Sequence, residues 1–355
     1  MQILYVGNGN YKHRGSRYYD VGRKILNGLI RNGHNVYFFS DRDVSRSSNL
    51  FGSLKLGKRY CNNAFIDTCY NFAPELILFG HADIINIESI VKVKTILPNV
   101  KMAQFNVDPV FRPHNIAQIN SKAPYMDATF ITTAGDILKK FSHPRGLVSY
   151  IPNPIDGSME WPRCHERSDQ PNDIFWAMRS GGGSSYPEDP RFTFPIYLEQ
   201  TGKIKIDYHG INGKPELLNA QYYKEIEKSR MGINISVERA FVDSPIASAN
   251  ELYLYSSDRI SHYMGSGLLT LARRGNRLEE LFKEDKELVL FESKEELAEK
   301  VIYFNHHDEE RKKIAYAGWK KSHQQLNERL VAKYILETTF RLKLTEDYVW
   351  PTQTY

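Results

Sequence analysis

Short apolar runs alternate with amphipathic segments along most of the chain. An apolar run at 3–7 precedes a segment with apolar residues at helical spacing, 16–33, and a second apolar run follows at 34–40. We expect Ser16 to be the N-cap of the helix and Gly33 its left-handed C-cap. A strand, a glycine-bearing loop, a helix and a strand form a βαβ unit, which joins two parallel strands by a right-handed crossover. The start of the chain therefore predicts a parallel sheet.

The same pattern continues in two blocks. Further strands of the first block are predicted at 75–80, 100–106, 128–133 and 147–154. After a stretch rich in Pro, Asp and Asn, a second block of strands is predicted at 174–178, 203–210, 231–236, 267–272 and 287–292. The remaining chain is almost entirely helical in pattern, and Ser293 with Glu296 forms a capping box at the start of one helix. This predicts an α/β protein of two Rossmann-like, doubly wound domains with a helical C-terminus.

The Pro-rich stretch sets the expected domain boundaries. A length of 355 residues fits two domains of ordinary size. We expect a first domain at 1–153, an interdomain linker at 154–172, a second domain at 173–330, and a final helix and tail at 331–355.

Composition and charge exclude several classes of protein. With 41% hydrophobic and 25% charged residues, the chain has the composition of a globular protein. The net charge is +5 and the basic residues are scattered, which suits anionic ligands or an acidic membrane surface. The sequence has no zinc-ligand spacing, RNP pattern or basic-region helix that would indicate a nucleic acid partner. The absence of a CxxC motif among three cysteines indicates reduced thiols.

The N-terminal sequence bears on localisation. The first residues enter a strand directly and lack the cationic start and cleavage site of a signal peptide. No apolar stretch approaches the ~18 residues of a membrane span. We expect a cytoplasmic protein, with peripheral contact to the inner membrane face through basic patches as an option.

Polar residues just beyond the strands are the candidates for chemistry. In open α/β sheets, ligands bind outside the carboxyl ends of the strands, and two such domains facing a central cleft would bring these loops together. The first loop, "GNGNYKHRG", lacks the GxGxxG spacing of a dinucleotide fingerprint. It is either a solvated turn or a wall of an acceptor site. The expected acceptor-binding residues are Gly9, Asn10, Lys12 and Arg14.

Two titratable side chains follow neighbouring strands of the first block. His81 comes directly after the strand at 75–80, and Asp108 comes just after the strand at 100–106. Each has a structural reading, a helix cap for His81 and a turn-initiating residue for Asp108. Each is also a natural general base for a sugar hydroxyl. We take both as candidate catalytic residues.

The second block offers groups for an anionic ligand. Arg179 ends a strand and precedes three glycines, and a guanidinium with exposed backbone N–H groups suits a diphosphate, although loop flexibility also explains the glycines. Other strand ends carry polar side chains suited to a base, a ribose or the floor of a cleft. The donor-binding residues expected at these strand ends are Arg179, Ser180, Gly181, His209, Asn212, Asn234 and Ser236.

The stretch "DRISHYMGSGLLTLARRGN" at 258–276 is the strongest candidate. If its first part is helical, Arg259 and His262 share one face. One interpretation is a helix-to-strand connection in which a single glycine is the C-cap. Gly-Ser-Gly exceeds that need and favours a loop whose bare backbone approaches a ligand. The donor contacts expected here are Arg259, His262, Gly265, Ser266, Gly267 and Leu268.

The second half of the chain resembles a known family. The stretches "YHGINGKP", "YYKEIEKSRMGINIS", "DRISHYMGSGLLTL" and "LEELFKEDKELVLFE" onward resemble the CgeB-like branch of the group 1 (GT4-like) glycosyltransferases over about residues 200–325. "IPNPID" is similar to the domain-junction motif of the wider superfamily. The resemblance implies a GT-B fold, a nucleotide-sugar donor held mainly by the second domain, an acceptor held by the first, a last helix that crosses back, and no metal or cofactor.

The resemblance also carries over to single residues. His262 stands where family members commonly have a Glu that binds the donor ribose, and Leu254 stands at the superfamily's partner Glu. Arg259 and Arg179 occupy positions where the family and the superfamily often have Arg, the latter near the donor phosphates. His81 is similar in location to a His that contacts the donor sugar. The missing Glu pair leaves the ribose contact and the stereochemistry open.

The expected function is transfer of a sugar from a nucleoside diphosphate sugar to a saccharide or lipid-linked saccharide acceptor, which the resemblance places in bacterial surface polysaccharide synthesis. Arg179, Arg259 and loop amides would stabilise the leaving diphosphate. In an inverting reaction, Asp108 or His81 would take the acceptor proton. The alternatives are a GT-B epimerase or phosphorylase, and a catalytically silent GT-B module that binds a glycan or a partner protein.

Overall fold

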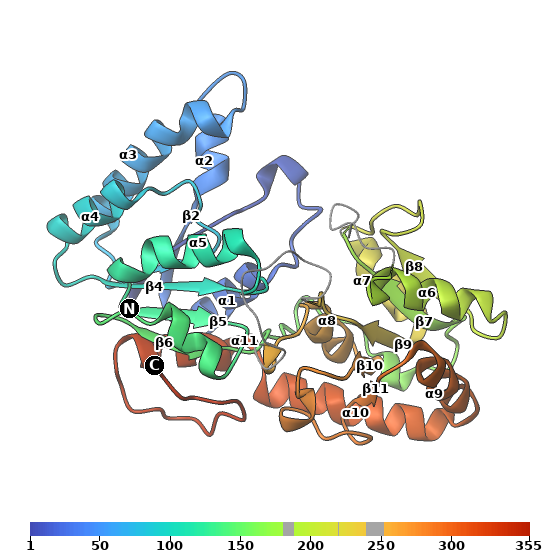
Figure 1. Cartoon of the computed structure of the whole chain (residues 1–355). Helices are drawn as coiled ribbons and strands as arrows, with labels where there is room; N and C mark the ends of the chain where they lie inside the picture. Colours follow the sequence, from blue (N-terminus) through green and yellow to red (C-terminus); the bar gives the residue numbers. More distant parts are fainter. Residues whose placement is uncertain (180–187, 219, 239–251) are drawn as a thin grey trace. The chain divides into compact units, whose positions relative to one another are not determined.

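The computed structural model describes residues 1–179, 188–218, 220–238 and 252–355. These residues form two compact units, one made of Met1–Pro152 with Glu328–Tyr355 and the other of Asn153–Asn327. Each unit contains a parallel β-sheet with helices packed on it (Figure 1). The predicted α/β class with two Rossmann-like domains is confirmed.

The first unit has a six-stranded parallel sheet of order β2-β1-β3-β4-β5-β6. Its strands are β1 (Gln2–Gly7), β2 (Asn35–Ser40), β3 (Leu76–Phe79), β4 (Lys101–Asn106), β5 (Ala128–Ile131) and β6 (Leu147–Tyr150). Its helices are α1 (Val21–Arg31), α2 (Asp41–Ser47), α3 (Leu54–Phe72), α4 (Ile87–Ile96), α5 (Pro113–Lys122) and α11 (Glu328–Thr339). Short 3₁₀ helices lie at Tyr11–His13, Ala123–Tyr125 and Asp136–Phe141.

Apolar runs account for this sheet. All four residues of β3 are buried, as expected for a parallel strand covered on both faces. On one face, Val6 of β1 and Phe79 of β3 belong to the same core cluster as Cys61 and Phe65 of α3. The helical period of α3 thus supplies one apolar stripe to the sheet.

The end of the chain packs within the first unit. A Cβ at Gly28 of α1 would overlap the carbonyl oxygen of Glu328, so the glycine allows α1 and α11 to approach closely. Arg31 Nη1 lies 2.5 Å from Glu328 Oε1. The tail then pairs with β6, where the N–H groups of Val148 and Tyr355 each donate to the other's carbonyl oxygen at 2.9 and 3.0 Å.

The second unit has a five-stranded parallel sheet of order β11-β10-β9-β7-β8. Its strands are β7 (Asn172–Ala177), β8 (Ile206–His209), β9 (Ser229–Asn234), β10 (Leu269–Arg273) and β11 (Val289–Phe291). Its helices are α6 (Pro190–Gln200), α7 (Ala220–Glu227), α8 (Arg259–Gly265), α9 (Lys294–His306) and α10 (Asp308–Gln325), with 3₁₀ helices at Cys164–Glu166 and Leu278–Glu280.

Local signals in the sequence are largely confirmed, with one correction. Gly33 has φ +85°, as a left-handed cap requires, and Ser293 Oγ accepts from the N–H of Glu296 at the start of α9. Ser16 is not the N-cap of α1. Asp20 has that role because its Oδ1 accepts from the N–H of Arg23 at 2.7 Å.

Residues 154–172, expected as a linker, pack into the second unit. Asp156, Glu160, Cys164 and His165 are buried there, and the N–H of Cys164 donates to the carbonyl oxygen of Ser266 at 2.9 Å. The Pro-, Asp- and Ser-rich composition reflects polar groups bonded inside the unit instead of a solvated connection. No helix in the described residues has the length and apolar character needed to cross a membrane.

Candidate functional site

The connections of the second sheet locate its ligand-binding edge. The chain passes from β7 to the neighbouring edge strand β8, and then returns to the other side of β7 as β9. The switch point of strand order therefore lies between β7 and β9. A crevice outside the carboxyl ends of such strands is where open α/β sheets bind ligands.

Arg259, the first residue of α8, reaches this switch point. Its Nη1 donates to the carbonyl oxygen of Ala177 at 3.4 Å and its Nη2 to that of Ile235 at 2.5 Å. Its guanidinium carbon lies 4.3 Å from the ring centre of Trp176, within the range of a cation–π interaction. One side chain thus joins the ends of β7 and β9 and fixes a positive charge between them.

Two buried amides that contact Ser256, one of them at the end of β9, have unused hydrogen-bonding capacity. Asn234 is buried, and its Nδ2 donates to Ser256 Oγ at 3.4 Å while its Oδ1 has no hydrogen-bond partner among the described residues. Asn153 is similar, since its Nδ2 donates to the Ser256 carbonyl oxygen and its buried Oδ1 has no such partner. Ser236 Oγ accepts from the N–H of Ser257. Because buried polar groups are usually hydrogen-bonded, these two amide oxygens stand out as acceptors without a partner among the described residues.

The remaining donor candidates of the strand ends have varied surroundings. Arg179 is exposed and lies two residues after the end of β7. His209 Nε2 lies 2.9 Å from Asp207 Oδ1, and its buried Nδ1 has no partner among the described residues. Asn212 is exposed, has φ +49° and donates to Tyr208 Oη at 3.1 Å. Ser180 and Gly181 lie outside the described residues.

His262 belongs to a buried cluster that the sequence did not predict. Its Nδ1 lies 2.8 Å from Glu160 Oε1 and 2.9 Å from Tyr223 Oη, which donates to the same carboxylate oxygen at 2.9 Å. Glu160 Oε2 accepts from the N–H of Asp156 at 2.7 Å. His262 is 3% exposed. The contacts of this histidine join α8 to the segment before β7 and to α7, and the ribose contact that the resemblance implies for it stays a prediction.

The Gly-Ser-Gly stretch is also internal, which corrects the expectation of an open ligand loop. Gly265, Ser266, Gly267 and Leu268 are buried. A Cβ at Gly265 would lie 2.8 Å from Glu160 Cγ, and one at Gly267 would overlap His165 Nδ1. Gly267 has φ +73°, and the N–H of Leu268 donates to the Tyr263 carbonyl oxygen. Gly267 therefore ends α8 as a left-handed cap, and the close approach is made by residues 155–165.

The switch point of the first sheet lies between β1 and β3, and both predicted catalytic residues lie at this edge. His81 follows β3 and Asp108 follows the next strand, β4; His81 Nε2 is 3.6 Å from Asp108 Oδ2. The two side chains are 37% and 45% exposed. The N–H of Asp108 donates to Asn106 Oδ1. The arrangement places an imidazole and a carboxyl group side by side at this edge, both accessible from solvent.

A third titratable group, Asp20, also interacts electrostatically with His81. Burial raises the pKa of Asp20, whereas its bond to the Arg23 N–H and the charge of His81 lower it. Asp20 was missed because its N-cap position lies 13 residues after the end of β1, inside what the apolar spacing indicated to be helix. A cap-forming Asp before "VGRK" is the signal that identifies it.

The loop after β1 is hydrogen-bonded at Gly9 to the end of β2. The N–H of Gly9 donates to Ser40 Oγ at 2.8 Å, and a Cβ there would lie 2.9 Å from Asp43 Oδ2. Asn10 and Arg14 have positive φ of 56° and 48°. Lys12 and Arg14 are exposed, as expected for side chains that reach an anionic acceptor, and Gly9 is used for close packing.

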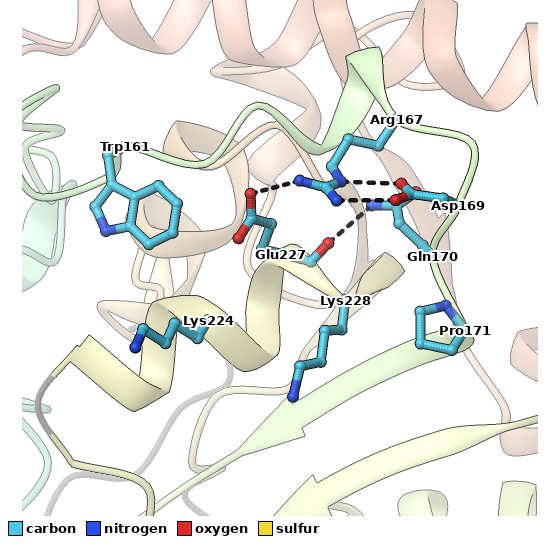
Figure 2. A pocket seen from close by; sticks show the side chains of 8 residues that line it. All are labelled: Trp161, Arg167, Asp169, Gln170, Pro171, Lys224, Glu227 and Lys228. Carbon is cyan, nitrogen blue, oxygen red and sulfur yellow. Dashed lines mark hydrogen bonds and ion pairs between the residues drawn. The ribbon is translucent and has the colours of Figure 1, made fainter.

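A pocket elsewhere in the second unit is lined by Trp161, Arg167 and Lys228 among others (Figure 2). Arg167 forms ion pairs with Asp169 and Glu227 across it. Lys228 directly precedes β9, so the pocket lies at the amino end of that strand and is separate from the switch-point edge.

Comparisons with known proteins agree with this architecture. Residues 182–337 match the family model described as glycosyl transferase-like. No curated protein matches the chain. Among solved structures, HepE of Anabaena in complex with UDP and glucose has 12% identity and a TM-score of 0.60, with 96% of this chain and 100% of that chain covered.

Two further solved structures are similar over the same extent. Sucrose-phosphate synthase of Thermosynechococcus elongatus has 11% identity and a TM-score of 0.57, with 96% of this chain and 99% of that chain covered. Trehalose-6-phosphate synthase OtsA has 10% identity and a TM-score of 0.59, with the same coverage. These likenesses confirm the GT-B fold expected from the sequence.

Proposed function

We propose that this protein is a glycosyltransferase that moves a sugar from a nucleoside diphosphate sugar to a saccharide acceptor, in the synthesis of a surface polysaccharide. The GT-B fold and the glycosyl transferase-like match over 182–337 support this proposal. The observation that carries it is the Arg259 guanidinium, held at the switch point between β7 and β9 by two main-chain carbonyls. A fixed cation at that edge is suited to a diphosphate.

The second unit is proposed to bind the donor, with uracil as its base. HepE has been solved with UDP-glucose and a trehalose-6-phosphate protein from E. coli with UDP-2-fluoro glucose, which supports the choice of base. Arg179 and Arg259 supply positive charge for the diphosphate. The unpartnered Oδ1 atoms of Asn234 and Asn153 accept hydrogen bonds from ribose hydroxyls or base N–H groups.

The first unit is proposed to serve the acceptor. In the transfer, the acceptor oxygen forms a bond to the anomeric carbon, the bond from that carbon to the diphosphate oxygen breaks, and its electron pair stays with the diphosphate. His81 takes the acceptor proton, and the nearby Asp108 carboxylate stabilises the imidazolium that forms. Since arginine charges compensate the leaving group, we propose that no metal is required.

Nucleotide binding is the first test. At about 100 times its Kd, a ligand stabilises the folded state by about 2.7 kcal/mol, which corresponds to a rise in Tm of roughly 5–10 °C for a domain of this size. UDP is expected to give such a rise, and GDP, ADP and CMP much smaller ones. Arg179→Ala is expected to weaken the UDP effect without changing Tm in the absence of nucleotide. Equal or absent shifts with all four nucleotides would contradict the proposal.

Turnover is the second test, and it separates transfer from the alternatives. Release of UDP from UDP-sugar that requires an added saccharide acceptor, and that persists in EDTA, is the expected result. Acceptor-independent consumption of donor would indicate an epimerase or hydrolase. The internal position of His262, where a ribose-binding Glu is expected, favours a catalytically silent binding module as the second candidate. UDP binding without turnover on a panel of saccharide and lipid-linked acceptors would support that candidate.

A further inference from the structure

The connection between α2 and α3 exposes two adjacent apolar side chains. Leu50 is fully exposed and Phe51 is 84% exposed, the two highest values among the large hydrophobic side chains of the described residues. In Figure 1 this connection is the blue loop that projects beyond the ends of both helices. Two neighbouring side chains of this kind indicate a contact with something outside the unit.

The loop holds this conformation through ordered hydrogen bonds. Asn49 Nδ2 donates to the carbonyl oxygens of Ser45 and Ser53 at 3.1 and 2.9 Å, and Asn49 Oδ1 accepts from the N–H of Ser53 at 2.9 Å. The N–H of Gly52 donates to the Asn49 carbonyl oxygen, and Gly52 adopts φ +60°. The turn is therefore already ordered with Leu50 and Phe51 exposed, so binding through these side chains would cost little further backbone entropy.

Helix α3 continues the same surface. Cys61, Phe65 and Cys69 belong to the sheet-covering core, so the buried stripe of the helix is already occupied. Leu56 and Tyr60 lie one turn apart and are 63% and 60% exposed. We call Leu50, Phe51, Leu56 and Tyr60, together with the neighbouring cations, the α2–α3 tip.

All charged residues between positions 44 and 66, which include the α2–α3 tip, are basic. Between Asp43 and Asp67 the charged residues are Arg46, Lys55, Lys58 and Arg59, with no acidic residue. Lys55, Lys58 and Arg59 are exposed and form no ion pair with a described residue. The tip thus combines a cationic rim with protruding apolar side chains.

We infer that the α2–α3 tip binds the surface of an anionic lipid bilayer. Leu50, Phe51 and Leu56 enter the boundary between headgroups and acyl chains, while the lysines and Arg59 contact lipid phosphates. A second copy of the chain fits poorly, because a two-fold contact would place Lys55, Lys58 and Arg59 against the same three cations, and only Arg46 has an acidic partner nearby, Asp43. A soluble protein that buries Leu50 and Phe51 is the other alternative, and the test below distinguishes it.

Vesicle co-sedimentation of the full chain tests this inference and does not depend on transfer activity. Wild type is expected to bind vesicles of phosphatidylcholine with about 30% phosphatidylglycerol, to bind pure phosphatidylcholine much less, and to lose binding as salt is raised. The double substitution Leu50→Ser with Phe51→Ser is expected to weaken binding about tenfold or more. Lys55→Glu with Lys58→Glu is expected to abolish the preference for anionic lipid.

Matched controls separate these effects from general changes in surface. Leu342→Ser removes another well-exposed leucine of the first unit, and Lys313→Glu with Lys320→Glu reverses two exposed charges of the second. All of these variants are expected to bind vesicles like wild type. The Phe51→Trp variant is expected to show a blue shift of its emission on adding anionic vesicles, relative to wild type, whose four other tryptophans provide the background.

Three results would overturn the inference. The first is absence of binding to anionic vesicles at low salt. The second is unchanged binding of the Leu50→Ser, Phe51→Ser variant, which would place the lipid contact elsewhere. The third is a wild type that self-associates through this surface, seen as a dimer that becomes monomeric in that variant, without vesicle binding.

Discussion

The carboxyl edges of the two sheets have the same topology but carry different chemistry. In the first unit, His81 and Asp108 lie 3.6 Å apart with substantial exposure. In the second, Arg259 is bonded to two main-chain carbonyls and stacked above Trp176. The exposed pair contributes little buried surface to its unit, whereas the Arg259 guanidinium is held in place by its contacts with both strand ends and Trp176. Substitutions at the first edge are therefore expected to change activity without changing stability, whereas substitution of Arg259 at the second edge is expected to change both.

The largest effect on transfer is expected from substitutions of the first edge. His81→Ala and Asp108→Asn should each lower the rate of sugar transfer, by about 10²–10⁴ for the residue that moves the proton. Because both side chains are partly exposed, the free energy of unfolding should change by no more than about 0.5 kcal/mol. Steady-state transfer and urea unfolding measure the two quantities. Asp136→Asn, a well-exposed acid of the same unit, is the control and should alter neither.

The next effect is expected at Arg259. Arg259→Ala should lower transfer by about 10²–10³, the usual loss for one charge-stabilising donor. It should also destabilise the protein by about 1–3 kcal/mol for each carbonyl acceptor left unpaired and buried. Arg259→Lys retains the charge and should recover part of the activity. An Arg259→Ala protein with wild-type stability would contradict the coupling, and Arg277→Ala, a more exposed arginine, provides the control.

A smaller effect, on stability, tests whether the Gly-Ser-Gly stretch is internal. Gly267 and Gly213 have nearly the same φ, +73° and +74°, but a Cβ at Gly267 meets His165 whereas one at Gly213 meets nothing within 4 Å. Gly213→Ala should cost about 1–2 kcal/mol for the left-handed conformation. Gly267→Ala should cost about 1–3 kcal/mol more through overlap. Equal losses in urea unfolding would mean that the stretch is open to solvent.

The smallest effect on transfer is expected from Asp41, at the carboxyl end of β2, whose substitution tests the pH dependence of stability. Burial raises the pKa of Asp41 to about 7, although its bonds to the N–H groups of Ile84 and Arg42 oppose the rise. The folded state therefore holds this proton more tightly than the unfolded chain does. Its contribution to stability is present below pH 4 and is lost as pH rises toward 7. Tm measured across this window should fall less in Asp41→Asn than in wild type.

The parts of the fold that depend on local pattern could be predicted from the sequence. Runs such as "LILF" have a single reading as buried strands, and all the strands expected from such runs are present. The pairing of His81 with Asp108 was also accessible, because residues that follow neighbouring parallel strands lie at one edge of the sheet. The chain order alone brings them together.

The parts that depend on distant partners could not be predicted. Helical spacing places Arg259 and His262 on α8 but does not say that one reaches strand carbonyls and the other a carboxylate 102 residues earlier in the chain. Glu160 lies in a Pro- and Asp-rich stretch whose composition is typical of a linker. A glycine that admits a ligand and a glycine that admits a neighbouring segment have the same sequence signature, so Gly265 and Gly267 were open to both interpretations.

The return of Glu328–Tyr355 to the first unit has a consequence for the order of folding. During translation, all of the second unit, Asn153–Asn327, leaves the ribosome before α11 does. Until then, the face of α1 around Gly28 has no helix on it, and β6 lacks its antiparallel partner at the tail. The unit that begins first is thus completed last, and the second unit is the first that is able to finish folding as the chain emerges.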